Sequence, residues 1–210
     1  MENAGEKLKL GCVVMAAGSA SRFGSNKLHA AVDGRSLILR ALDAVPAGAC
    51  EQVVVVTQYD DIASLAKEFS FTAIWNSHPE YGVSNTIRLG LAALSDCGGV
   101  LFQVADQPLL RRESTAALVR FFREHPEQIV ALGHGGVRGN PCIFPARFFP
   151  ELLALRGDCG GSAVIRAHSE ALLLYEVSAR ELMDADTPEA ISAIRTSAAA
   201  SRSPESAREK

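Results

Sequence analysis

The segment Val13–Leu28, VVMAAGSASRFGSNKL, joins an apolar strand to a turn rich in small residues. The strand ends in the small residues Ala16, Ala17 and Gly18. Two cationic residues, Arg22 and Lys27, follow in the turn. The glycine spacing is neither that of a P-loop nor that of a G-x-G-x-x-G turn. Free N–H groups beside a guanidinium and an ammonium suit a triphosphate, whose charge rises at the α-phosphorus during attack. The alternative is an ordinary strand-to-helix loop with two solvated cations.

Outside this segment, short apolar runs alternate with stretches of helical periodicity, which predicts an α/β fold with a mostly parallel central sheet. The predicted strands are Leu10–Met15, Gln52–Thr57, Gly99–Val104, Ile129–Leu132 and Ala171–Val177. The predicted helices are Leu37–Ala44, Ile62–Phe69, Thr86–Leu94, Thr115–Arg123 and Pro188–Arg195, the last with Thr187 as its cap. The run Val53–Val56 is apolar without alternation, as expected of a strand buried on both faces.

The length of 210 residues fits one domain. We expect an N-terminal extension over residues 1–9, the folded domain over 10–196, and a disordered tail over 197–210, where no useful apolar stripe remains.

The composition excludes several classes of function. The net charge of −3 provides no basic field for nucleic acid. No apolar run approaches a membrane span and the N-terminus has no h-region, so we expect a cytoplasmic protein. The five cysteines form no C-x-x-C pair, which argues against a zinc knuckle, and their odd number argues against a disulfide framework.

A carboxylate follows the predicted strand in Val100–Pro108, VLFQVADQP. Ligands of open α/β sheets bind at the carboxyl ends of the strands, so Asp106 and Gly18 should face one crevice. Asp106 there could hold Mg²⁺ together with phosphate oxygens. The alternative is a cap or turn residue before Pro108.

Two more aspartates, Asp184 and Asp186, directly precede the last predicted helix. Either is a candidate second metal ligand, and either could instead support the helix N-terminus, a role that the residues alone slightly favour.

Two further segments have the composition of functional loops. Tyr81–Thr86 leads into a helix carrying Arg88, and Gly133–Pro141, GHGGVRGNP, is too rich in glycine for a simple hairpin. Flexible connections are the alternative for both. A Ser-His-Asp hydrolase is not supported, because the sequence has no G-x-S-x-G elbow.

Taken together, four motifs resemble the molybdenum cofactor cytidylyltransferase family, within the molybdopterin nucleotidyltransferases. They are AAG-x-x-x-RFG-x-x-K, ADQP, GVSNTIRLGL and D-A-DTPE, and the resemblance spans residues from about 10 to 195. It implies a Rossmann-like, three-layer nucleotidyltransferase domain that depends on Mg²⁺, with Mn²⁺ as an alternative ion. It also implies transfer of CMP from CTP to the phosphate of molybdopterin or of molybdenum cofactor, with release of pyrophosphate. A molybdenum hydroxylase is the partner that such a product suggests.

The resemblance also assigns roles to individual residues. The nucleotide would be bound by Ala16, Ala17, Gly18, Arg22, Lys27, Gly82 and Ser84. Catalysis would rest on Arg22, Lys27 and Asp106, and the metal on Asp106 and Asp186. The acceptor would contact Arg138, Asn140 and Asp158.

The acceptor half departs from the family pattern. Arg138–Pro141 reads RGNP where relatives often have R-G-H-P, and Gly157–Ser162 reads GDCGGS in place of G-D-x-G-A-R. Nucleotidyl transfer is therefore the firmer expectation. The alternatives are a sugar-phosphate or other small-molecule nucleotidyltransferase, and a non-catalytic carrier of molybdenum cofactor.

Overall fold

A computed structural model describes residues 8–18, 27–187, 189–192 and 194. Its centre is a seven-stranded sheet in the order β5-β4-β1-β6-β8-β7-β9. The strands are β1 (Leu10–Ala16), β4 (Gln52–Thr57), β5 (Thr72–Trp75), β6 (Gly99–Val104), β7 (Ile129–His134), β8 (Val137–Pro145) and β9 (Leu172–Glu176). Neighbouring strands are parallel except where β8 pairs with β6 and β7. The expected mostly parallel α/β sheet is confirmed.

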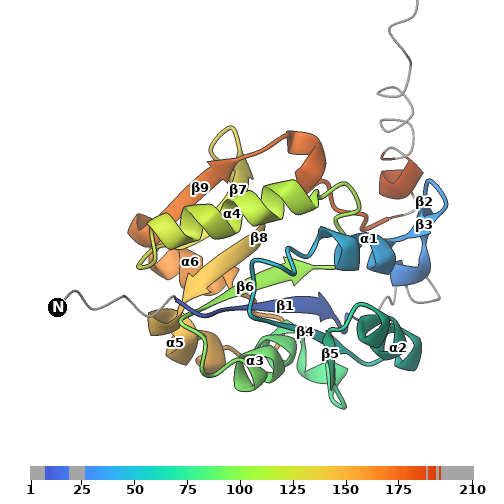
Figure 1. Cartoon of the computed structure of the whole chain (residues 1–210), viewed down its shortest axis with the longest axis horizontal. Helices are drawn as coiled ribbons and strands as arrows, with labels where there is room; N and C mark the ends of the chain where they lie inside the picture. The colour runs from blue at the N-terminus through green and yellow to red at the C-terminus, as the bar shows by residue number, and fades with distance from the viewer. Residues whose placement is uncertain (1–7, 19–26, 188, 193, 195–210) are drawn as a thin grey trace, which may run out of the picture.

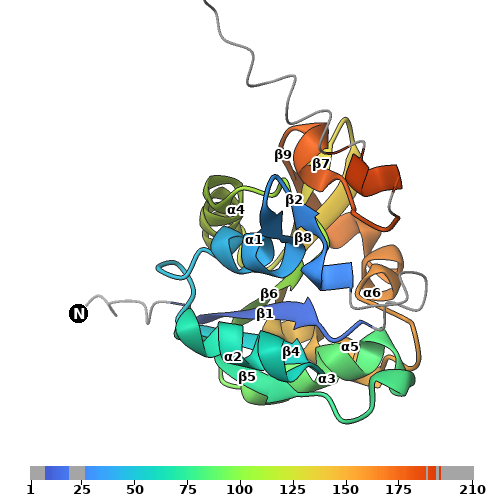
Figure 2. The ribbon, with the colours of Figure 1, turned by 90° about the vertical axis from the view of Figure 1, so that its right-hand side faces the viewer.

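Helices cover both faces of the sheet and make the predicted three layers (Figure 1). One face packs against α1 (Leu37–Ala44), α2 (Asp60–Glu68) and α4 (Arg112–Glu124). The other packs against α3 (Val83–Ala93), α5 (Phe149–Ala154) and α6 (Ser162–Ala167). In Figure 2 the sheet runs from top to bottom, with α1, α2 and α4 toward its left and α3, α5 and α6 toward its right. Alternate residues of the central strands feed these two cores: Val55 faces the first, and Val54 and Val56 face the second.

Short elements complete the chain: the β2–β3 hairpin (Ala31–Val32 and Arg35–Ser36) and five 3₁₀ turns in the described residues. The last helix is described at residues 189–192 and 194. Its predicted cap is confirmed, because the Thr187 hydroxyl accepts a hydrogen bond of 3.1 Å from the Ala190 N–H. The tail over 197–210 and most of the extension over 1–9 lie outside the described residues.

The prediction of a glycine-rich loop over Gly133–Pro141 was wrong. The segment is a hairpin in which β7 and β8 are joined by Gly135 and Gly136, with φ of 57° and 79°. Two consecutive residues at positive φ match the right-handed twist of the paired strands, and glycine adopts that conformation without strain. The glycines therefore make the tight hairpin turn.

Helix α3 begins three residues earlier than predicted, at Val83 rather than Thr86. Ser84, Asn85 and Thr86 are polar but buried in the first turn, where polar side chains replace the apolar periodicity that marks a helix. In the part of the chain that the structure describes, the helices are all too short or too polar to cross a bilayer.

Candidate active site

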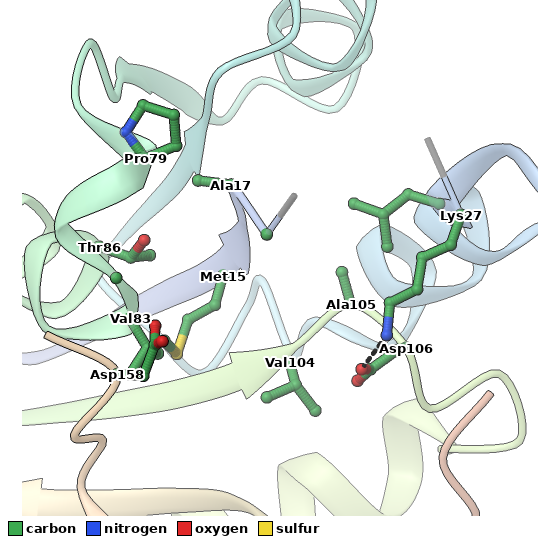
Figure 3. A pocket seen from close by; sticks show the side chains of 13 residues that line it. Met15, Ala17, Lys27, Pro79, Val83, Thr86, Val104, Ala105, Asp106 and Asp158 are labelled. Atoms are coloured by element: carbon green, nitrogen blue, oxygen red, sulfur yellow. Dashed lines mark hydrogen bonds and ion pairs between the residues drawn. The ribbon is translucent and has the colours of Figure 1, made fainter. Parts of the chain in front are cut away.

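A cavity of about 390 Å³ opens at the carboxyl ends of β1 and β6. The parallel register places Met15 beside Val104, so the residues that follow the two strands come together. Gly18 and Asp106 both line the cavity, as predicted from the topology of open α/β sheets. Figure 3 shows Lys27 and Asp106 on one side of this space and Thr86, Val83 and Asp158 on the other.

Lys27 joins two of the predicted metal ligands. Its Nζ lies 2.8 Å from Asp106 Oδ2 and 2.9 Å from Asp186 Oδ1. Partial burial by itself lowers the pKa of Lys27, but the charges and hydrogen bonds of Asp106 and Asp186 outweigh it, so the pKa stands above its usual value. The lysine is therefore a fixed cation at the edge of the cavity.

A third carboxylate, Asp184, lies beside this pair. The Ala185 N–H donates to the Asp106 carbonyl oxygen over 2.8 Å, which ties the segment before the last helix to the end of β6. Burial and the neighbouring negative charges of Asp106 and Asp186 raise the pKa of Asp184, against a hydrogen bond from Gln107 that lowers it. Because Thr187 caps the helix, the two aspartates are available for other roles.

The carboxylates have the donor chemistry of a magnesium site. Mg²⁺ is usually held by one or two carboxylates together with substrate phosphates and water, rather than by a full cage of protein ligands. Asp106 and Asp186 already converge on one cation, the Lys27 ammonium. Within the described residues no group of three or more acidic, histidine or cysteine ligands is preassembled. The pair has the one or two carboxylates that such an ion uses beside phosphate oxygens and water.

The two glycines predicted to bind nucleotide differ in what requires them. A Cβ on Gly18 would meet no described heavy atom within 4 Å, and the residue has no positive φ. A Cβ on Gly82 would lie 2.4 Å from the Gly157 carbonyl carbon, and Gly82 has a φ of 78°. Gly82 is thus required by the fold, whereas no contact within the described residues requires a glycine at position 18.

The loop around Asp158 packs against the start of α3. The Ser84 N–H donates to the Gly157 carbonyl oxygen over 3.1 Å, and the Ser84 side chain is buried. Gly82 and Asp158 line the cavity together with Val83. Ser84 therefore supports the wall of the cavity from behind.

A second, smaller cavity of about 150 Å³ adjoins the first, sharing Met15, Val83 and Val104 with it. Arg138, Asn140, Cys142 and Phe144, on one face of β8, contribute to its lining. Arg138 Nη2 donates to the Ser162 hydroxyl over 2.8 Å. Two of the residues predicted to contact the acceptor thus lie here, while the third, Asp158, lines the first cavity.

Sequence reasoning missed several residues around the first cavity. Buried Asn76 accepts a 2.7 Å hydrogen bond from Asn85, and its amide also reaches the Thr86 hydroxyl, which fixes the wall at Thr86. Gln58 and Tyr59 contact the turn after β1. The polar segment GVSNT is the sequence feature that could have indicated a role for Thr86 at the cavity, whereas no local sequence pattern indicates one for Gln58. Arg22 lies outside the described residues.

The family model for the MobA-like NTP transferase domain matches residues 12–172, a range that contains both cavity-lining strand ends. The chain belongs to this family. It is therefore a nucleotidyltransferase of the MobA-like type, as the resemblance of the four motifs predicted.

Individual relatives agree with this assignment. The chain is 26% identical over 196 residues to the purine catabolism protein PucB of Bacillus subtilis (strain 168), covering 87% of this chain and 94% of PucB. It is 28% identical over 120 residues to a 2-C-methyl-D-erythritol 4-phosphate cytidylyltransferase of Dehalococcoides mccartyi (strain CBDB1), covering 50% and 49% of the two chains. The crystal structure of Rv0371c from Mycobacterium tuberculosis H37Rv has a similar fold, with a TM-score of 0.77 at 19% identity, covering 91% of this chain and 99% of that one.

Proposed function

We propose that this nucleotidyltransferase moves CMP from CTP to the phosphate of molybdopterin or of molybdenum cofactor and releases pyrophosphate. The observation that carries the proposal is the juxtaposition of the cavity-lining Gly18 with the Lys27–Asp106–Asp186 cluster, at a cavity that shares lining residues with a second one. The first cavity would take the nucleotide and the second would take part of the acceptor. The four sequence motifs support the choice of molybdopterin.

In this reaction an oxygen of the acceptor phosphate forms a bond to the α-phosphorus of CTP. The bond from that phosphorus to the oxygen bridging to the β-phosphate breaks, and its electron pair leaves with pyrophosphate. The chain's own contribution is to hold the two substrates in line and to place positive charge near the phosphates. Lys27 supplies one such charge, and Arg22 is the second candidate.

Asp106 and Asp186 would hold Mg²⁺, or Mn²⁺, as oxygen ligands. When bound, such an ion offsets negative charge on the phosphates and on the leaving pyrophosphate. The two carboxylates would place the positive charge of the ion at the edge of the cavity that Gly18 lines. Asp184 is the neighbouring carboxylate that could join them.

A phosphorylated polyol is the second candidate acceptor. The relative that is similar over half of this chain is named as a cytidylyltransferase for methylerythritol phosphate. The altered RGNP and GDCGGS segments, which contribute to the second cavity, are where such a difference in acceptor would arise.

A screen for pyrophosphate release decides between these acceptors. The four NTPs are crossed with molybdopterin, a polyol phosphate and several sugar phosphates, each with Mg²⁺ and with a chelator. Pyrophosphate release from CTP with molybdopterin as the only active acceptor supports the proposal. Release only with the polyol phosphate or a sugar phosphate identifies that compound class as the acceptor instead. A protein that binds molybdenum cofactor but releases no pyrophosphate from any pair would be a carrier and would overturn the proposal.

A further inference from the structure

Two side chains at the end of β4 bind the turn that follows β1. The ladder between these strands ends at the pair Ala16 and Thr57. Beyond it, Gln58 Nε2 donates to the Ala17 carbonyl oxygen over 2.8 Å, and the Tyr59 hydroxyl donates to the Gly18 carbonyl oxygen over 3.1 Å. Side-chain donors thus take over where the backbone ladder stops.

The end of β4, which carries both donors, is held by further contacts of Tyr59. The Tyr59 N–H donates to the Thr57 hydroxyl over 3.1 Å, and the Tyr59 carbonyl oxygen accepts from Ala63 in the first turn of α2 over 3.0 Å. The half-buried Tyr59 ring packs against the core that α1 and α2 share with the sheet. The two hydrogen bonds therefore tie the turn to the end of β4 and the start of α2.

The hydrogen bond from Gln58 sets the direction of the next peptide group. The peptide between Ala17 and Gly18 is trans, since the cis bond in the described chain is Asn140–Pro141. In a trans peptide the N–H points opposite to the carbonyl. With the Ala17 carbonyl held by Gln58 at the end of β4, the Gly18 N–H is directed away from that side chain, and Gly18 itself lines the cavity.

We infer that Gln58 and Tyr59 are positioning residues for the phosphates of the nucleotide. They hold the carbonyl oxygens of Ala17 and Gly18 toward the end of β4, so that the Gly18 N–H is left to face the phosphates. A carbonyl dipole in the reverse orientation would repel a triphosphate, whereas fixed N–H donors stabilise it without reorganisation. The inference rests on the proposed function for the nature of the ligand.

The test uses Gln58→Leu, Tyr59→Phe and the double variant in the full chain, with Tyr175→Phe as the matched control. Tyr175 lies on the edge strand β9 and lines neither of the two cavities. Pyrophosphate is the binding probe, measured by calorimetry, and steady-state kinetics give KM for CTP and for the acceptor separately.

We expect the double variant to bind pyrophosphate about tenfold more weakly or worse, and to raise KM for CTP by a similar factor. KM for the acceptor should be unchanged in the double variant. The control variant should match the wild type in pyrophosphate affinity and in both KM values. Tyr59→Phe removes only one oxygen atom, so this variant alone tests the inference if Gln58→Leu does not fold.

A merely structural role gives a different result: a lower unfolding temperature with wild-type pyrophosphate affinity, which would overturn the inference. Failure of the proposed function is distinguishable, because it is the absence of pyrophosphate release by the wild type. The calorimetric comparison stands independently of turnover.

Discussion

The ammonium nitrogen of Lys27 lies 2.8 Å from Oδ2 of Asp106, although the two residues are 79 positions apart in the chain. The same nitrogen lies 2.9 Å from Oδ1 of Asp186. The lysine thus occupies the space between two carboxylates that would hold a metal. A cation bound by both carboxylates has to share them with Lys27 or displace it.

Replacing Lys27 with methionine should strengthen binding of metal in the absence of nucleotide. The variant removes a competing positive charge while keeping a side chain of similar length. We expect the Kd for Mn²⁺ to fall by about tenfold, which corresponds to about 1.4 kcal/mol. Titration followed by electron paramagnetic resonance gives the Kd directly, with the exposed Lys67→Met as control. Unchanged Mn²⁺ affinity would show that the lysine does not compete for the carboxylates.

Asp106→Asn should retain the fold and lose activity. The side chain is nearly isosteric, but it can no longer supply a full negative charge to a metal and to Lys27. We expect turnover to fall about a hundredfold or more, the range typical for loss of one electrostatic contact to a transition state. Circular dichroism checks the fold, and the exposed Glu68→Gln serves as the control. Near wild-type turnover at limiting Mg²⁺ would rule out Asp106 as a ligand.

Alanine substitutions at Gly18 and Gly82 should separate an effect on nucleotide binding from an effect on the free energy of unfolding. Gly82→Ala places a Cβ against the Gly157 backbone at positive φ, so the free energy of unfolding should fall by about 1 kcal/mol or more. Gly18→Ala should change the free energy of unfolding by less than about 0.5 kcal/mol, because its Cβ would meet no heavy atom of the described residues within 4 Å. It should instead raise KM for CTP. Denaturant titrations and initial rates measure the two effects, and equal loss of stability in both variants would contradict this assignment.

CTP should be preferred over GTP by more than about tenfold in kcat/KM, since a polar site rejects a base that leaves its hydrogen-bonding groups unpaired. Ala17 is buried and lines the first cavity, where its methyl group reduces the room for a larger base. Ala17→Gly should therefore shift the ratio toward GTP. Competition between the two nucleotides below saturation gives the ratio, and equal use by the wild type would remove the assignment of cytidylyl transfer.

Alkylation at pH 8 should modify Cys159 and spare the other cysteines. Cys159 is exposed, whereas Cys12, Cys50, Cys97 and Cys142 are buried. Burial raises the pKa of Cys142 to about 11, so only on the order of 0.1% of this thiol is ionised at pH 8. Mass spectrometry should count one modified thiol in the native protein and none in Cys159→Ser. Rapid modification of native Cys142 would show that the second cavity opens to solvent more than its burial indicates.

Local patterns were sufficient for much of the fold. The unbroken apolar run of β4 predicted a strand buried on both faces, and Thr187 before Pro188 predicted a helix start. These features depend on residues near one another in the chain, because burial pattern and capping are local properties. Strand β8 escaped prediction because Gly139 and Pro141 lower β propensity, and its pairing with β6 and β7 compensates for this only in the folded sheet.

The sequence by itself determined that Gly18 and Asp106 end two buried strands, and therefore that they share one crevice. The tertiary structure alone decided that Lys27 meets Asp106 and Asp186, that Gly82 is required by the backbone at Gly157, and that Gln58 and Tyr59 hold the turn after β1. Each of these contacts joins segments that are far apart in the chain. Strand order and packing distance, rather than any local pattern, determine which distant side chains meet.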